Sequence, residues 1–319
     1  MKILVYGAGV IGGCLANMLC GTANEITVLA RGKQKETLER DGLVAKNYFG
    51  GKTTTSHPRV IDALAPGDSY DVIFAVMQYQ QMQAILPALA ANASPVVVLV
   101  GNTLDAPAME AYLHQHSTSP KIVVFGFQGT GGERVAGHYT YIAFGKPGMS
   151  VGSTTPKEQW LPLLERAFEG AAYRLRYQDN MDVWYKSHVA FVMPVCYICY
   201  RYGCDLTRAT KADLNKAIDA SLEGTLLLKH LGLPVPQSDI DSYTKSRWVT
   251  CFFYRLCRST KIGELAASRH ARNAVGEMIA LNDGFNQLRA KAPDFPMPAW
   301  TELEQYMPKA GNEAKEGDR

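Results

Sequence analysis

The sequence predicts an α/β first half followed by an all-helical second half. In the first half, short runs of β-branched and apolar residues alternate with stretches whose apolar residues have helical spacing. These runs are almost continuously apolar, as expected for a parallel sheet that helices cover on both faces. From about residue 180 onward, long helical stretches dominate. The length of 319 residues fits two domains of ordinary size.

The individual elements can be assigned in chain order. Strands of the parallel sheet are expected at 3–6, 25–29, 71–76, 95–100 and 121–125. A further strand, antiparallel and near an edge, is expected at 139–144, and a last short one at 173–177. Helices are expected at about 158–169, 181–202, 208–231, 238–257 and 273–292. The change in the pattern of strand and helix signals after about residue 156 predicts a first domain at 1–155 and a helical domain at 156–308. The last residues, 309–319, are expected to form a charged, disordered tail.

Composition and charge narrow the class of protein. A hydrophobic fraction of 47% with 20% charged residues is typical of a globular chain. The net charge of +3 is spread over the chain, so no nucleic-acid partner is indicated. The apolar run at 189–200 is too short to span a membrane and contains Pro194, so no membrane partner is expected. Seven cysteines, an odd number, favour reduced thiols and a cytoplasmic location.

A glycine-rich motif directly follows the first predicted strand and opens a helix. It reads Gly7-Ala-Gly9-Val10-Ile11-Gly12. Gly7 permits a tight turn, Gly9 lets a pyrophosphate approach the backbone, and Gly12 allows the helix to pack close to the strand. The helix N-terminus then offers N–H donors to phosphate. The motif predicts a Rossmann-type dinucleotide-binding domain, because a Gly-rich turn without a ligand is the weaker interpretation in this position.

The end of the second predicted strand indicates which dinucleotide binds. An NAD site usually has an acidic residue there to accept the ribose 2′-hydroxyl. This chain has Arg31 and Lys33 instead, and Arg31 can pair with a 2′-phosphate. The alternative is that Arg31 and Lys33 are solvent-exposed loop residues that bind no phosphate. We therefore expect the cofactor to be NADP(H).

With these features the chain resembles the ketopantoate reductase (2-dehydropantoate 2-reductase) family, as a divergent member. The likeness spans most of residues 1–305 and is patchy in the helical half. The other matching motifs are Asn102 after a strand, Ile142-Ala-Phe-Gly145, Trp184-Tyr-Lys186, Ser259-Thr260 with Glu264, and Glu277-Met-Ile-Ala-Leu-Asn282.

The resemblance implies reduction of a small 2-oxo acid by NADPH in a cleft between the domains, as in pantothenate biosynthesis. Lys186 would be the general acid, and Asn102 would position the cofactor or Lys186. Glu277, with Ser259 or Thr260, would face the substrate. An ammonium suits this role because reduction of a carbonyl leaves an alkoxide that must be stabilised and protonated. The alternative for Lys186 is a lysine at a helix start whose stem packs on apolar surface while its ammonium reaches solvent. The alternative for Glu277 is a surface carboxylate in the first turn of a helix.

Three departures from the family pattern leave the substrate open. The loop after the 71–76 strand lacks the family's lysine, since 77–80 reads Met-Gln-Tyr-Gln. The asparagines expected four and eight residues after Lys186 are Ala190 and Pro194. The segment 266–274 resembles a lengthened loop. A protein on the same fold that binds NADP(H) without catalysis, as a sensor or interaction protein, and an enzyme for a different ketone therefore both remain open.

Three other features of the sequence are weaker candidates for a functional site. Cys196, Cys199 and Cys204 lie in apolar helical sequence without a second ligand pair, so no metal is expected. His188 lies about 200° round the helix from Lys186 and should point elsewhere. The glycine-rich segment 128–132 is interpreted as a pocket-lining turn. A homodimer through the helical domain stays open.

Overall fold

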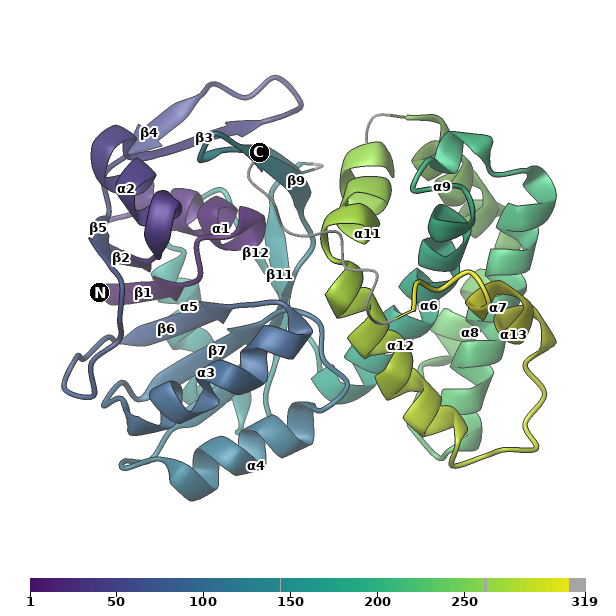
Figure 1. Cartoon of the computed structure of the whole chain (residues 1–319). Helices are drawn as coiled ribbons and strands as arrows, with labels where there is room; N and C mark the ends of the chain where they lie inside the picture. The colour runs from purple at the N-terminus through teal and green to yellow at the C-terminus, as the bar shows by residue number, and fades with distance from the viewer. Residues whose placement is uncertain (144, 261–262, 310–319) are drawn as a thin grey trace. The chain divides into compact units, whose positions relative to one another are not determined.

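The computed structural model describes residues 1–143, 145–260 and 263–309. The described chain forms two compact units, one ending at Met181 and the other beginning at Asp182. Figure 1 shows the strands in the first unit and the long helices in the second. Within the described residues no helix is long and apolar enough to cross a membrane. The tail expected at 309–319 lies, apart from its first residue, outside the described residues.

An eight-stranded sheet is the framework of the first unit. In spatial order its strands are β12 (Arg174–Tyr177), β11 (Gly148–Gly152), β8 (Ile122–Gln128), β7 (Val96–Val100), β6 (Val72–Val76), β1 (Lys2–Tyr6), β2 (Glu25–Leu29) and β5 (Arg59–Ile61). Every neighbouring pair is parallel except β8 with β11. Each residue of β6 and β7 is buried, which explains their unbroken apolar sequences. The predicted α/β fold and its five parallel strands are confirmed.

A second, four-stranded sheet was not expected. Its order is β4 (Thr54–Ser56), β3 (Leu43–Asn47), β10 (His138–Ile142) and β9 (Gly131–Val135). The strand predicted at 139–144 is β10, but it is an inner strand, antiparallel to β9 and parallel to β3. The prediction of an edge was wrong because β3 and β9 contain charged residues and glycines and therefore gave no strand signal. Phe144 lies outside the described residues.

The helices of the first unit follow the strands closely. They are α1 (Val10–Cys20), α2 (Gly32–Asp41), α3 (Tyr79–Ala91), α4 (Ala106–His116), the short 3₁₀ turn η1 (Lys157–Gln159) and α5 (Leu161–Ala167). The helices α3 and α4 pack side by side, as Figure 1 shows. The helix α1 packs on β10, where Tyr139 is only 2% exposed.

The segment 156–181 belongs to the first unit rather than to the helical one. β12 extends the main sheet by pairing in parallel with β11. Trp160 is fully buried, and Phe168 stacks on Tyr173 at 4.2 Å between ring centroids. The units therefore meet at 181/182 and not at 155/156. The alternation of strands and helices continues through one more helix and strand, α5 and β12, before the all-helical part of the chain begins.

The second unit is helical throughout its described part. Its elements are α6 (Met181–Arg201), η2 (Leu206–Arg208), α7 (Lys211–His230), α8 (Gln237–Tyr243), α9 (Arg247–Ser259), the π-helical turn η3 (Glu264–Ser268), α11 (Arg269–Asn273), α12 (Val275–Arg289) and α13 (Pro298–Glu304). The helix expected at 238–257 is two helices, because the backbone leaves helical geometry at Thr244. The segment 266–274, expected to be a loop, is helical through Asn273.

Aromatic packing joins the helices of the second unit. Trp300 of α13 is fully buried, stacks on Phe285 of α12 at 4.4 Å and meets Tyr197 of α6 edge-on at 5.7 Å. Glu223 of α7 accepts hydrogen bonds from the backbone N–H groups of Ala299 and Trp300. A carboxylate at a helix N-terminus is stabilising, so this contact fixes where α13 begins.

Gly13 tests how tightly α1 is held against the second sheet. A Cβ at this position would lie 2.2 Å from the Tyr139 ring, so Gly13→Ala must displace the ring or the helix. We expect the free energy of unfolding to fall by about 1–3 kcal/mol in urea denaturation. Gly21→Ala is the control, because its Cβ would make only ordinary contact at 3.4 Å. Equal losses in the two variants would contradict the packing argument.

Candidate functional site

The carboxyl ends of the central strands meet at one edge of the main sheet. The chain runs from β1 to β2 on one side and returns to β6 on the other, so the strand order reverses between β1 and β6. In open α/β sheets, ligands bind outside the carboxyl ends of the strands at this reversal. Gly7 follows β1, Met77 follows β6, and Gly101 follows β7 at this edge.

The glycine motif has the geometry that a pyrophosphate-binding turn needs. Gly7 has a φ of +118°, and a Cβ there would lie 2.3 Å from the Val76 carbonyl oxygen. A Cβ at Gly12 would lie 1.9 Å from the Gly7 carbonyl oxygen. Gly9, in contrast, would place its Cβ in open space, and no side chain caps α1 at this residue. Gly7 and Gly12 therefore lie against backbone atoms, whereas the surface at Gly9 has free space where a phosphate would approach.

Two residues of the second sheet support this turn, and neither was among the predicted site residues. The Ala8 carbonyl accepts hydrogen bonds from the Tyr139 hydroxyl at 2.9 Å and from Arg134 Nη1 at 2.8 Å. Gln34 in turn donates to the Tyr139 hydroxyl at 2.7 Å. Burial raises the pKa of Tyr139, which keeps the phenol neutral. Arg134 brings a positive charge to the glycine turn, which only the pairing of β9 with β10 could reveal.

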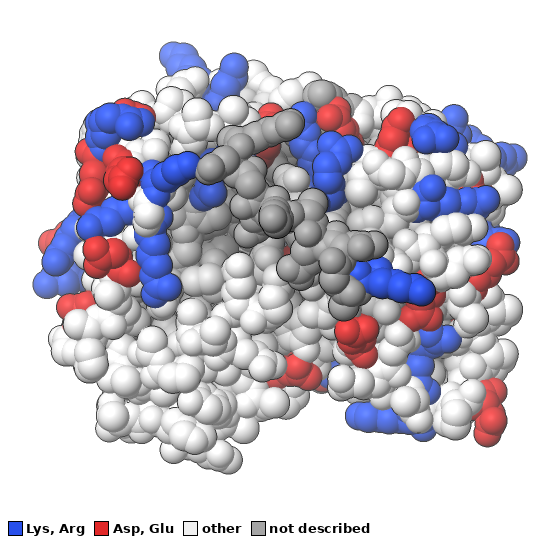
Figure 2. All heavy atoms as spheres, in the orientation of Figure 1, with Lys and Arg blue, Asp and Glu red and all other residues white. Residues whose placement is uncertain are grey.

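The predicted 2′-phosphate residues lie at the end of β2. Arg31 is exposed and precedes α2, and its guanidinium donates to the Asp62 carbonyl at 3.3 Å and the Tyr6 hydroxyl at 3.4 Å. Lys33 is exposed in the first turn of α2. Lys35, which sequence reasoning missed, is paired with Asp62 at 2.8 Å. Figure 2 shows Lys and Arg side chains gathered over α2, mixed with acidic ones.

Asn102 is held next to the loop that follows β6. Its neighbour Gly101 has a φ of +155°, and a Cβ there would lie 2.3 Å from the Met77 carbonyl oxygen. Within the segment 77–80, where a lysine was expected from the resemblance, α3 begins at Tyr79, whose hydroxyl donates to Asp105. Asp105 precedes α4, so this contact ties the start of α3 to the loop after β7. Asn102 is half-buried at the same edge as the glycine turn.

Lys186 lies in the first turns of α6, in the second unit. It is only 7% exposed, and its ammonium is paired with Asp182, one helical turn earlier. Trp184 stacks on His188 at 5.1 Å with the rings nearly parallel, on a different part of the helix surface. A buried ammonium needs a counter-charge, so Asp182 holds Lys186 in place. The i, i+4 spacing could have identified Asp182 from the sequence.

The positions four and eight residues after Lys186 are closed by helix packing. Ala190 is fully buried, and a Cβ on Gly224 of α7 would lie 3.1 Å from the Ala190 Cβ. Pro194 lies within α6 and is buried as well. The two helices approach closely where the resemblance would place pocket amides. Ala190 and Pro194 are therefore part of the helix packing of the second unit.

The remaining predicted substrate residues lie further along the second unit. Glu277 is 3% exposed in the first turn of α12, and its charge contributes to raising the pKa values of Cys196 and Tyr200, after burial and the neighbouring thiols. Lys186 lies ten residues before Cys196 on α6, or about 15 Å of helix rise. Ser259 is exposed at the end of α9, and the Thr260 hydroxyl donates to the Leu256 carbonyl at 2.7 Å.

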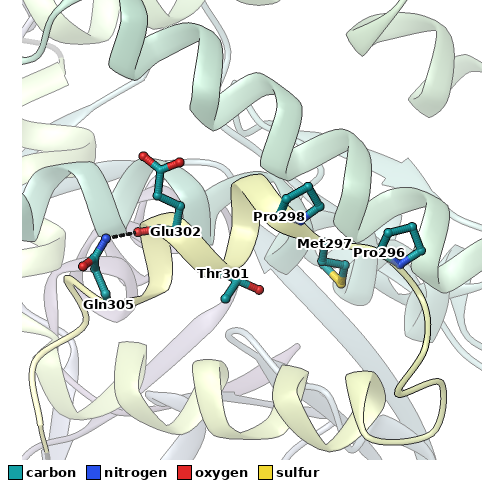
Figure 3. A pocket seen from close by; sticks show the side chains of 6 residues that line it. All are labelled: Pro296, Met297, Pro298, Thr301, Glu302 and Gln305. Atoms are coloured by element: carbon teal, nitrogen blue, oxygen red, sulfur yellow. Dashed lines mark hydrogen bonds between the residues drawn. The ribbon is translucent and has the colours of Figure 1, made fainter.

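A shallow depression elsewhere contains none of these residues. It surrounds the start of α13 and is lined by Pro296, Met297, Pro298, Thr301, Glu302 and Gln305, as Figure 3 shows. Its lining is mostly apolar and offers no charged group other than Glu302. Within the described residues, no group of three or more His, Cys, Asp or Glu side chains is placed to hold a metal ion.

Comparison with known proteins agrees with this geometry. Residues 3–149 match the family described as "Ketopantoate reductase PanE/ApbA". This stretch is a PanE/ApbA domain. The resemblance predicted from the motifs is thus confirmed for the PanE/ApbA domain, which contains the glycine turn, Arg31 and Asn102. The "Uncharacterized oxidoreductase YkpB" of Bacillus subtilis is 36% identical over 85 residues, and this match spans only 27% of either chain.

Solved structures resemble the chain beyond its PanE/ApbA domain. A 2-dehydropantoate 2-reductase from Methylococcus capsulatus has a TM-score of 0.74 at 16% identity, over 96% of both chains. A PanE/ApbA family ketopantoate reductase from Ralstonia eutropha JMP134 gives 0.74 at 16% identity, over 96% of this chain and 97% of that one. D-mandelate dehydrogenase with NADH and anilino(oxo)acetate gives 0.73 at 14% identity, with the same coverage. At these identities the likeness concerns the fold.

Gly9 separates ligand binding from folding. Gly9→Ser adds a Cβ where the protein has open space, and serine is a favourable residue before a helix. We expect thermal stability to be unchanged or slightly higher, while the dissociation constant for NADPH rises at least about tenfold, because the side chain obstructs the pyrophosphate. Calorimetry and thermal unfolding measure the two effects. Unchanged NADPH affinity would contradict the proposed position of the pyrophosphate.

Proposed function

We propose that the protein is an NADPH-dependent oxidoreductase that reduces a small 2-oxo acid to the 2-hydroxy acid. The observation that carries the proposal is the glycine turn, closed at Gly7 and Gly12 and open at Gly9, at the reversal point of the sheet. A buried and ion-paired Lys186 in the second unit supports the reductive chemistry. The proposal requires Lys186 to meet the nicotinamide held by the first unit.

Residues of the first unit would hold the dinucleotide. The backbone N–H groups of Val10 and Ile11, at the start of α1, fit a pyrophosphate together with the nearby Arg134 guanidinium. Arg31 and Lys33 fit the 2′-phosphate, because both are exposed beyond the end of β2. Asn102 lies beside the same strand ends and would orient the nicotinamide or Lys186.

Lys186 would act on the substrate carbonyl oxygen. The bound dinucleotide would supply the hydride. Lys186 would stabilise the negative charge that develops on the oxygen and donate a proton to it. Asp182 would keep the ammonium in position for this transfer, since its carboxylate already pairs with Nζ. Asp182 is thus a positioning residue.

The substrate would differ from ketopantoate in how it is held. With Ala190 packed against α7, the pocket lacks the amide that the resemblance implies four residues after Lys186. Glu277, Ser259 and Thr260 remain as groups that would face the substrate. One structural relative is named with anilino(oxo)acetate, so aryl-substituted 2-oxo acids belong in the substrate panel beside ketopantoate.

The closed Ala190 position also favours a second candidate function. A chain that keeps the dinucleotide turn but fills its substrate pocket would bind NADP(H) without turnover, as a sensor or interaction protein. Such a protein would bind NADPH yet leave its absorbance unchanged with every 2-oxo acid in the panel. Turnover of any member of the panel excludes this candidate.

Lys186 is the residue on which catalysis should depend. For Lys186→Ala we expect kcat to fall by about 10²–10⁴-fold, because the general acid is lost, while NADPH binding stays within about twofold. Steady-state kinetics and calorimetry measure the two quantities. Lys211→Ala, which removes an exposed lysine of α7, should change neither. Full activity in Lys186→Ala would contradict the assigned role.

Arg31 should decide between the two dinucleotides. Arg31→Ala removes a charged hydrogen-bond donor to the 2′-phosphate, so NADPH affinity should fall about 10–100-fold while NADH affinity changes little. Parallel titrations with both cofactors measure the difference. Lys35→Ala is the control, since Lys35 is already paired with Asp62. Equal losses for NADPH and NADH would rule out the 2′-phosphate role.

A further inference from the structure

The carboxyl end of α6 brings two cysteines together. The helix ends at Arg201, and the chain then turns through Gly203 and Cys204, with φ values of +63° and +62°. The Cys204 N–H donates to the Cys199 carbonyl at 2.7 Å, a bond from the sixth residue of the turn back to the first. This bond closes the carboxyl end of α6 and brings the side chains of Cys199 and Cys204 close together.

The two thiols are neighbours at this turn. The backbone bond between Cys204 and Cys199 brings their side chains together, and each thiol influences the acidity of the other. Arg272 of α11 approaches from the other side and donates to the Cys204 carbonyl at 3.1 Å. Cys199 is 1% exposed and Cys204 is 9% exposed, so solvent reaches Cys204 more easily. A left-handed backbone at a residue other than glycine, as at Cys204, often marks a functional position.

The surroundings give the two sulfurs opposite acidities. The neighbouring Cys199 thiol and the Arg272 charge lower the pKa of Cys204 to about 7, although burial opposes them. The interaction with Cys204, together with burial, raises the pKa of Cys199. Burial raises the pKa of Cys14 and Cys196 to about 12, and that of Cys20 and Cys257 to about 11. Cys204 is therefore a much better nucleophile than these four thiols.

We propose that Cys199 and Cys204 form a reversible dithiol–disulfide pair, a modification site for hydroperoxides. The Cys204 thiolate attacks one peroxide oxygen and the O–O bond breaks. This step gives Cys204 sulfenic acid, and with hydrogen peroxide the leaving hydroxide takes a proton and departs as water. The Cys199 sulfur then attacks the Cys204 sulfur, a second water leaves, and the disulfide forms.

The structure accounts for this division of roles. Cys204 is the more exposed and more acidic thiol, so it meets the oxidant first. Cys199 lies beside Cys204 at the closed helix end, so it can resolve the sulfenic acid before further oxidation. A thiol reductant restores both thiols, which gives a reversible cycle. The site uses neither the residues of the glycine turn nor Lys186, so it stands independently of the proposed enzymatic function.

Peptide mapping of the oxidised protein tests the pair directly. Trypsin cuts after Lys186, Arg201 and Arg208, so Cys199 and Cys204 lie on the separate peptides 187–201 and 202–208. The reduced full-length chain is treated with hydrogen peroxide, alkylated, digested without reductant and analysed by mass spectrometry. We expect these two peptides to be joined, and to separate after reduction. The free thiols should fall from seven to five.

Variants identify the sulfurs involved. Cys204→Ser should abolish the joined peptide, and Cys199→Ser should leave Cys204 to oxidise without a partner. Cys196→Ser is the matched control, because Cys196 shares peptide 187–201 with Cys199, and it should retain the joined peptide. Peptides 187–201 and 202–208 recovered separately from oxidised wild-type protein would overturn the proposal, as would a link through Cys196. The wild-type digest decides this even if a variant does not fold.

Discussion

The first unit is organised around a main-chain turn that has no room for side chains. The Gly7 backbone lies against the Val76 carbonyl, and Gly12 lies against the Gly7 carbonyl, so β1, β6 and α1 meet within one turn of chain. The second sheet then closes over it, since Tyr139 and Arg134 both donate to the Ala8 carbonyl. Because these contacts fix the turn on three sides, its free surface is the one at Gly9. The rest of the candidate dinucleotide site follows from that single opening.

In the second unit, helix packing fills a position at which the resemblance implies a polar group. A Cβ on Gly224 of α7 would lie 2.9 Å from the Trp300 ring and 3.1 Å from the Ala190 Cβ of α6, so these neighbours would have to move. In the first unit, the Tyr79–Asp105 hydrogen bond occupies the segment where a lysine was expected. Each change replaces a polar group that would face a ligand with a contact inside the protein. Residues 3–149, which match the PanE/ApbA family, thus keep the glycine turn, while two positions at which the resemblance implies polar groups make contacts inside the protein.

Much of the first unit was predictable because its central strands are buried on both faces. Apolar runs in the sequence identify five strands, which are β1, β2, β6, β7 and β8. β9 and β3 do not, since their sequences contain charged residues and glycines and only backbone pairing makes them strands. β12 was expected as a strand but assigned to the wrong domain, because a four-residue strand carries no information about its partner. The break between α8 and α9 was missed for a similar reason, since no proline or glycine marks Thr244.

The sequence by itself determined the glycine turn, the cations after β2 and the position of Lys186 on a helix, because each depends on residues close together in the chain. Only the tertiary structure decided what surrounds them. Arg134 reaches the glycine turn through strand pairing, and Gly224 meets Ala190 through helix packing, across 126 residues in the first case. The contact of Cys199 with Cys204 is local, but it depends on two successive left-handed residues that the sequence pattern did not reveal. Spacing along a chain identifies which groups are present, whereas folding decides which of them share a site.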